Sequence, residues 1–283
     1  MKRKLLMLLL VCLVTIFTLP AYACTEWSAA GSWVEGGGSI LAKNRDWVPD
    51  HNQTLKLVTP EQGYRYFGIF LEKSQIAVKG GINECGLVVY NQAASSIPRK
   101  ERDVMPYTKN LTHTILTQCK TVDDVIKIAP TFLGPMMLTI GDKTKTAYIE
   151  IGPENKTAIQ ENSNGVLYHT NHYIQENMLE NNKKSGESST IRYERIQQLL
   201  ERTNLPFTIN DFITMSEDQN DGPDNSIWRI GSSPKKARTL ATFIVQLPTS
   251  GSPLLYIKVA NPGQAPQYYH LRADDIFSGK TAY

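Results

Sequence analysis

Ala21-Tyr22-Ala23-Cys24-Thr25-Glu26-Trp27 lies where an apolar N-terminal segment ends and sequence typical of a folded protein begins. Residues 2–4 (Lys-Arg-Lys) are positively charged, and residues 5–19 form an apolar run. The small-x-small triplet that follows completes the layout of a secretory signal peptide with its cleavage site. We therefore predict a signal peptide over residues 1–23 and an exported mature chain, periplasmic or secreted, that begins at Cys24.

A cysteine at the first position of a mature chain carries a thiol and a free α-amine on one residue. The thiol can act as a nucleophile and the amine as its base. Cleavage after Ala23 is therefore expected to activate an enzyme as well as to release an exported protein. A lipoprotein is the alternative, because lipidated cysteines also follow a leader directly. Tyr22 stands where a lipoprotein signal has a small residue, so ordinary cleavage is favoured.

Composition argues against two broad classes of partner. The chain has 283 residues, with 30 Lys+Arg against 27 Asp+Glu, and three of the basic residues belong to the predicted signal peptide. The mature chain is thus balanced, which gives no electrostatic case for binding nucleic acid or an anionic membrane. After position 23, no apolar run approaches the roughly 18–20 residues of a spanning helix. We expect one domain over residues 24–283 and no membrane contact after signal removal.

Strand and helix signals follow each other in blocks along the chain. Residues 24–34 and 39–47 indicate two strands around a glycine-rich turn at 35–38, as in a β-hairpin. Further strands are predicted at 64–71, 76–78, 87–91, 136–140, 146–151, 165–171, 239–247 and 254–259, with a turn at 80–86. Helices are predicted around 111–116, from 121, from 188 and around 212–215, with loops at 95–106, 176–187 and 218–224. Such blocks favour an α+β fold over an alternating parallel sheet.

Five segments, taken together and in order, resemble the N-terminal nucleophile hydrolases of the choloylglycine hydrolase and penicillin acyltransferase group. They are Cys24-Thr25, Lys43-Asn44-Arg45-Asp46-Trp47, Gly81-Ile82-Asn83-Glu84-Cys85-Gly86-Leu87, His169-Thr170-Asn171-His172 and Ser188-Ser189-Thr190-Ile191-Arg192. The resemblance spans nearly the whole mature chain. It implies a four-layer αββα sandwich with the nucleophile at the start of a central strand.

The resemblance also implies a set of site residues. Cys24 matches the nucleophile, and Asp46 matches the carboxylate that holds its α-amine. Asn171 matches the side-chain amide that helps to form the oxyanion hole. Arg192 matches the arginine that supports the site electrostatically. The predicted hairpin independently brings Asp46 close to Cys24.

Two positions depart from the family pattern. Where choloylglycine hydrolases usually have Arg-Asn-x-Asp, this chain has Lys43-Asn44-Arg45-Asp46. Either Lys43 or Arg45 therefore supplies the positive charge beside the thiol. The second oxyanion asparagine of the family falls two residues beyond Asn91, which is the available amide on the same strand face.

Each of these residues also has a purely structural explanation. Asp46 suits a turn, Asn171 suits a strand end where it bonds backbone groups, and Arg192 suits a helix surface. His169 and His172 lie three residues apart on a predicted strand, so they face opposite sides and do not suggest a zinc site. We expect no metal and no cofactor.

Together these predictions indicate an exported cysteine amidohydrolase that cleaves a linear N-acyl amide through an acyl-thioester on Cys24. The resemblance implies N-acyl amino acids, conjugated bile acids, penicillin V and acyl-homoserine lactones as candidate substrates. An acyltransferase on the same fold and a non-catalytic envelope lipoprotein or binding module are the alternatives. Pairing of Cys85 with Cys119 is left open, as is a homo-oligomer.

Overall fold

A computed structural model of the chain describes residues 23–74, 77–184 and 186–283. The predicted signal peptide therefore lies outside the described residues except for Ala23. Within the described ranges, no helix is long and apolar enough to cross a membrane.

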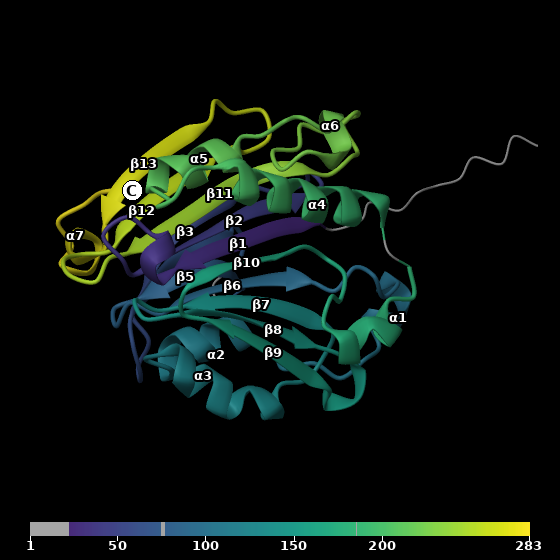
Figure 1. Cartoon of the computed structure of the whole chain (residues 1–283), viewed down its shortest axis with the longest axis horizontal. Helices are drawn as coiled ribbons and strands as arrows, with labels where there is room; N and C mark the ends of the chain where they lie inside the picture. The colour runs from purple at the N-terminus through teal and green to yellow at the C-terminus, as the bar shows by residue number, and fades with distance from the viewer. Residues whose placement is uncertain (1–22, 75–76, 185) are drawn as a thin grey trace, which may run out of the picture.

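Two antiparallel sheets lie face to face between two layers of helices (Figure 1). The first sheet has the order β10 (Gly165–His169), β1 (Cys24–Ala30), β2 (Ser39–Trp47), β11 (Arg238–Leu247), β12 (Leu254–Val259), β13 (Gln267–Arg272). The second has the order β3 (Gln53–Val58), β4 (Tyr66–Leu71), β5 (Val78–Asn83), β6 (Val88–Ala93), β7 (Met136–Gly141), β8 (Thr146–Ile151), β9 (Thr157–Asn162). The expected αββα sandwich is confirmed.

The helices are divided between the outer faces of the two sheets (Figure 1). Helices α4 (Glu187–Arg202) and α5 (Ile209–Ser216) cover the first sheet, and α2 (Leu111–Gln118) and α3 (Val122–Ile128) cover the second. Two short helices, α1 (Arg99–Arg102) and α6 (Gly222–Asn225), lie in the connections, and a third, α7 (Ala273–Phe277), follows the last strand. Each interface between layers holds its own apolar cluster, so burial on both faces fixes the sheets in place.

The β1–β2 hairpin occupies the middle of the first sheet, and its register decides which side chains face the second sheet. Cys24 lies opposite Arg45, and Ala30 lies opposite Ser39 at the turn end. Side chains alternate between faces along a strand. Trp27 is fully buried against α5, whereas Ser28 Oγ lies 3.1 Å from Thr146 Oγ1 of the second sheet. Cys24 shares the face of Ser28 and so points between the sheets.

The predicted turn over residues 80–86 was wrong in its first half, because β5 runs to Asn83. The glycines there serve close strand packing instead. A Cβ atom on Gly81 would lie only 2.5 Å from the carbonyl oxygen of Phe67 on β4. The turn itself is confined to the following residues and is closed by the bond from the Gly86 N–H to the Asn83 carbonyl.

Sequence patterns missed three strands, β3, β9 and β13, and all three lie at sheet edges. An edge strand exposes many of its side chains to solvent, so the apolar alternation that marks a strand is weak there. The predicted loop over 176–187 also contains a 3-10 helix, Glu176–Asn181, which buries Met178. The predicted loop over 95–106 contains α1.

Asn44 joins the first sheet to the segment that follows α5, and this contact predicts a stability change. Its Nδ2 donates to the carbonyls of Ser216 (2.8 Å) and Ile227 (2.9 Å), and its Oδ1 accepts from Thr242 Oγ1 (2.7 Å). Because Asn44→Ala leaves these buried groups unpaired, we expect it to lower the free energy of unfolding by at least about 2 kcal/mol. Urea denaturation measures this change.

Asn177→Ala is the matched control, since Asn177 is exposed. It should change the free energy of unfolding by no more than about 0.5 kcal/mol. Equal effects of the two substitutions would contradict a structural role for Asn44.

Candidate active site

Cys24 is the first residue of β1, and both of its backbone polar groups are held by side chains. Its N–H donates to Asn171 Oδ1 at 2.8 Å, and its carbonyl accepts from Arg192 Nη1 at 2.7 Å. The residue is buried, with 6% of its surface exposed. Three segments that are far apart in the sequence therefore meet at the start of β1, as the resemblance implied.

Arg192 supplies most of these contacts from α4. Its Nη1 also donates to Thr25 Oγ1 at 2.7 Å, and its Nη2 donates to Asn171 Oδ1 at 3.2 Å. Burial lowers the pKa of Arg192 to about 10, while the nearby negative charge of Asp46 raises it. Arg192 is therefore charged at neutral pH and is fully buried, not a surface residue of the helix.

Asn171 follows β10 and is fixed by the serine-rich start of α4. Its backbone N–H donates to Ser189 Oγ at 2.9 Å, and Thr170 Oγ1 donates to the Ser189 carbonyl at 2.9 Å. The side-chain Nδ2 donates to the carbonyl of Ala93 at 2.9 Å. These bonds orient the amide with its oxygen toward the nitrogen of Cys24.

Asp46 follows Arg45 on β2 and faces the helix layer. Its Oδ1 accepts from Thr239 Oγ1 at 2.8 Å, and its Oδ2 lies 3.5 Å from Arg229 Nη1. Burial raises the pKa of Asp46, and the charges of Arg229 and Arg192 lower it.

We expected Asp46 to hold the nitrogen of Cys24. Among the described residues, that nitrogen donates to Asn171 instead. The reason is covalent: in this chain the nitrogen is still joined to Ala23 and has a single N–H, which Asn171 Oδ1 accepts. Removal of residues 1–23 would convert this amide into an amine with further N–H donors. Asp46 lies one position beyond Arg45, the β2 partner of Cys24.

Arg45, and not Lys43, is the basic residue beside the thiol. Arg45 is the direct cross-strand partner of Cys24, whereas Lys43 is the partner of Glu26 and forms a buried ion pair with it at 2.7 Å. Burial lowers the pKa of Arg45, while the charge of Cys24 and a hydrogen bond to it raise that pKa. Glu26 therefore neutralises the charge of Lys43, whereas the guanidinium of Arg45 faces the sulfur of Cys24.

Asn91 does not bring its amide to Cys24. Its Nδ2 donates to the Val78 carbonyl at 3.0 Å and to Thr112 Oγ1 of α2 at 2.5 Å. The side chain therefore points to the helix-covered face of the second sheet. Only the Asn91 carbonyl reaches the space between the sheets, where it accepts from Lys43 Nζ.

A buried polar chain behind Asn171 was not predicted. His169 Nε2 lies 2.8 Å from Glu150 Oε1, and Gln92 Nε2 lies 3.0 Å from His169 Nδ1. Glu150 Oε1 also accepts the backbone N–H of Ile174 at 2.6 Å. The chain thus holds both ends of the segment that carries Asn171. The only hint in the sequence was a glutamate inside an otherwise apolar strand, β8.

The other two described cysteines lie away from Cys24, and neither forms a disulfide. Burial raises the pKa of Cys119 to about 11 and raises that of Cys85. A thiol with a raised pKa is a poor nucleophile at neutral pH. Within the described ranges, no cluster of His, Cys, Asp and Glu has the arrangement of a metal site.

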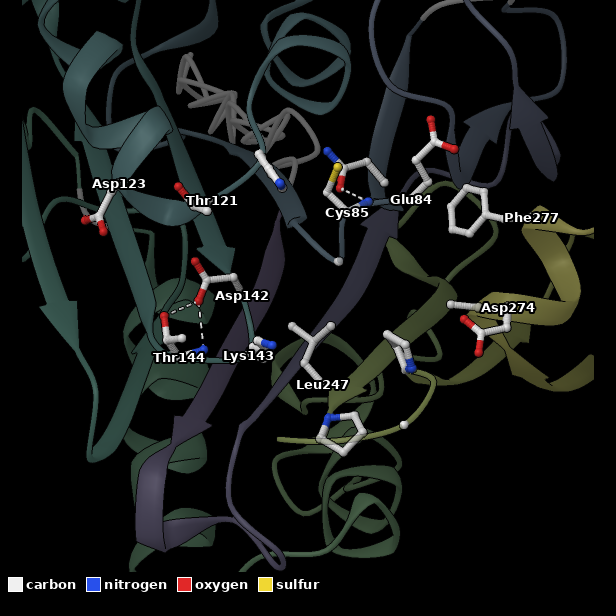
Figure 2. Close-up of a pocket in the computed structure, with 17 residues that line it drawn as sticks. Glu84, Cys85, Thr121, Asp123, Asp142, Lys143, Thr144, Leu247, Asp274 and Phe277 are labelled. Atoms are coloured by element: carbon white, nitrogen blue, oxygen red, sulfur yellow. Dashed lines mark hydrogen bonds between the residues drawn. The ribbon is translucent and has the colours of Figure 1, made fainter.

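A cavity of about 510 Å³ lies at the opposite end of the sandwich (Figure 2). Cys85, Asp142 and Phe277 are among its lining residues. Ser39 Oγ, at the turn end of the hairpin, donates to the Asp142 carbonyl at 2.7 Å. That end is separated from Cys24 by the length of β1, roughly 20 Å at the usual rise per residue. The cavity is therefore distinct from the site around the thiol.

Comparison with known proteins identifies the family of this chain and proteins of similar fold. The family described as "Acyl-coenzyme A:6-aminopenicillanic acid acyl-transferase" matches residues 33–262. The chain belongs to this family. The match includes Asp46, Asn171 and Arg192, and it begins after Cys24.

Among solved structures, the fold is similar to that of penicillin V acylase from Agrobacterium tumefaciens. The two share 12% sequence identity with a TM-score of 0.57, over 88% of this chain and 86% of the other. A thermostable penicillin G acylase from Alcaligenes faecalis matches at 10% identity with a TM-score of 0.44, over 62% of this chain and 49% of its own. No curated protein matches the chain. The family and the N-terminal nucleophile hydrolase fold together support an enzyme that cleaves amides or transfers acyl groups.

The buried guanidinium of Arg192 predicts that even a lysine, which keeps the positive charge, would lower the stability of the protein. In Arg192→Lys, one ammonium cannot replace two guanidinium nitrogens that bond Cys24, Thr25 and Asn171 at once. We expect the substitution to lower the free energy of unfolding by at least about 2 kcal/mol, measured by urea denaturation.

Arg202→Lys, at the exposed end of the same helix, should have almost no effect and serves as its control. An Arg192→Lys protein as stable as the parent would show that the contacts at the start of β1 contribute little.

Proposed function

We propose that this protein is an exported cysteine amidohydrolase of the choloylglycine hydrolase-like kind, which cleaves a linear N-acyl amide through an acyl-thioester on Cys24. The observation that carries the proposal is the hydrogen bond from the Cys24 nitrogen to Asn171 Oδ1. It holds the future base in place on the residue that bears the nucleophilic sulfur. Removal of residues 1–23 would free this nitrogen as the α-amine.

The first chemical step needs a thiolate and a proton acceptor. Thiols and α-amines both titrate close to neutral pH, so the proton can pass from the sulfur of Cys24 to its own amine. Arg45 faces the sulfur and stabilises the negative charge, while Asn171 Oδ1 accepts from the amine and fixes its direction. Asp46 contributes a further acceptor for the amine once the peptide bond to Ala23 is cut.

The thiolate then attacks the substrate carbonyl, forming a C–S bond and placing negative charge on the carbonyl oxygen. Asn171 Nδ2 has two N–H groups, one of which donates to Ala93. The other is available to the oxyanion, and one such donor contributes about 3 kcal/mol. The α-ammonium returns its proton to the leaving nitrogen as the C–N bond breaks. Water, deprotonated by the α-amine, hydrolyses the thioester and regenerates the thiol.

Acyl transfer is the second candidate, because the description of the matching family is that of an acyltransferase. The same acyl-thioester would then be attacked by an amine in place of water. Adding increasing concentrations of a primary amine separates the two: an acyltransferase makes N-acyl product at the expense of free acid, whereas a hydrolase continues to release acid.

The assignment of the nucleophile predicts different outcomes for two cysteines. We expect Cys24→Ala to abolish release of acid from a panel of N-acyl amides, because no other group supplies both sulfur and amine. Cys85→Ala should retain nearly full activity, since Cys85 lies in the distant cavity and its pKa is raised. Circular dichroism of both proteins verifies that they are folded.

An uncleaved precursor is the second control. Its Cys24 nitrogen remains an amide, so it should be inactive even though the thiol is present. Activity in the Cys24→Ala protein would mean that another residue is the nucleophile.

A further inference from the structure

The space between the sheets near Cys24 contains more positive than negative charge. Lys43 and Glu26 form a fully buried ion pair and cancel each other. Arg45 faces the thiol, and the carboxylates that act on it are Asp46, which faces the helix layer, and the exposed Asp50. Lys79, which sequence analysis did not select, adds a further cation to the same space.

Lys79 lies at a bulge in β5. Gly80 pairs with Ile69 and Val78 pairs with Phe70, so Lys79 is the extra residue between the two pairs. Val78 packs in the cluster under α2, on the outer face. At Gly80, by contrast, an added Cβ would lie 3.6 Å from Lys43 Cδ, on the inner face. The bulge thus places Lys79 directly before Gly80, the residue that lies beside Lys43 on the inner face.

Lys79 is a half-buried cation without a counter-ion. It forms no hydrogen bond or ion pair with any described residue. Burial and the charges of Arg45 and Lys43 lower the pKa of Lys79, the charge of Cys24 raises it, and the net result is a pKa of about 8. Arg45, Lys43 and Cys24 are thus the charged groups that act on the Lys79 ammonium.

A nitrogen of Arg45 is a second hydrogen-bond donor beside the thiol without a partner in the described ranges. Nη2 of Arg45 is buried and has no hydrogen-bond partner among the described residues. The guanidinium cannot easily turn to find one, because its Nε donates to Gln53 Oε1 at 3.1 Å and its Cζ lies 4.8 Å from the Trp47 ring centre. A buried guanidinium nitrogen without a partner is costly, and an anionic ligand would satisfy it.

We propose that Lys79, together with Nη2 of Arg45, binds a carboxylate on the amine half of the substrate, so that the enzyme prefers N-acyl amino acids to neutral N-acyl amides. This inference rests on the proposed amide hydrolysis at Cys24. In an N-acyl α-amino acid, two bonds separate the carboxylate carbon from the scissile nitrogen. Cations that lie beside the nucleophile therefore suit such a substrate.

The negative charges beside Arg45 and Lys79 change in number as the reaction proceeds. Before attack, Arg45 is shared between the thiolate and the substrate carboxylate, and Lys79 supplies the second positive charge. After acylation the thioester is neutral, and the departing amino acid carries the carboxylate away. Among the candidate substrates, N-acyl amino acids, conjugated bile acids and penicillin V carry an acidic group on the amine half, whereas acyl-homoserine lactones do not.

The test compares an N-acyl amino acid with its C-terminal carboxamide, which has the same acyl chain and scissile bond but no negative charge. The mature, Cys24-initiated protein should show a kcat/KM at least tenfold higher for the acid. Lys79→Gln should reduce this ratio at least tenfold, mainly through KM for the acid. Lys73→Gln, an exposed lysine just before the same strand, should leave the ratio unchanged.

The pH dependence gives an independent readout. Lys79 is protonated below about pH 8, so KM for the acid should rise as the pH increases through 8, and KM for the carboxamide should not. Rates that rise through pH 8 for both substrates would instead make Lys79 a base and overturn the proposal.

Failure of this proposal is distinguishable from failure of the proposed function. Cleavage of the carboxamide as efficiently as the acid, or an equal loss on both substrates in Lys79→Gln, would overturn carboxylate binding while amide hydrolysis stands. Absence of any cleavage by the mature parent protein would overturn both.

Discussion

The contacts of the Arg192 guanidinium are the constraint on which the rest of the site depends. A fully buried cation is tolerated only when its donors are satisfied and a negative charge is near. Here the backbone of Cys24, the hydroxyl of Thr25 and the amide of Asn171 accept its hydrogen bonds, and Asp46 supplies the charge. The same bonds that satisfy the arginine therefore join α4, β1 and the end of β10.

This arrangement would separate the two functions that we propose for Cys24, nucleophile and base, between the two faces of its strand. The backbone nitrogen is held at the strand end by Asn171, near the helix-facing groups Asp46 and Arg192. The thiol points the other way, between the sheets, where Arg45 lies opposite. A residue inside a strand has no free nitrogen to offer, so only the first residue of a mature chain can combine these roles.

Much of the fold could be predicted from the sequence, because its central features are local. Only residues 31–38 separate β1 from β2, so the two strands pair as sequence neighbours, and the apolar face of α4 shows where that helix packs. The edge strands β3, β9 and β13 gave weak patterns because few of their side chains are buried in a core.

The site was predictable only in part, for reasons of geometry. Cys24, Asn171 and Arg192 were found through an ordered resemblance, and the structure brings them together. The choice between Arg45 and Lys43 could be made only once the cross-strand partner of each was known. Glu26, on the neighbouring strand, neutralises Lys43, whereas Arg45 lies opposite Cys24. Lys79 was missed because it is the extra residue of a bulge, which has no clear sequence signature. Asn91 was misplaced because its side chain bonds under α2.

The central claim is that export cleavage leaves Cys24 as a free N-terminal residue that carries the acyl group during turnover. Intact-mass and peptide analysis of the exported protein, quenched in acid during turnover of an N-acyl amide, tests it most directly. The account predicts an N-terminal peptide that begins at Cys24 and carries the mass of one acyl group, which hydroxylamine removes. A lipid-modified Cys24, a chain that begins elsewhere, or an acyl group on another residue would contradict it.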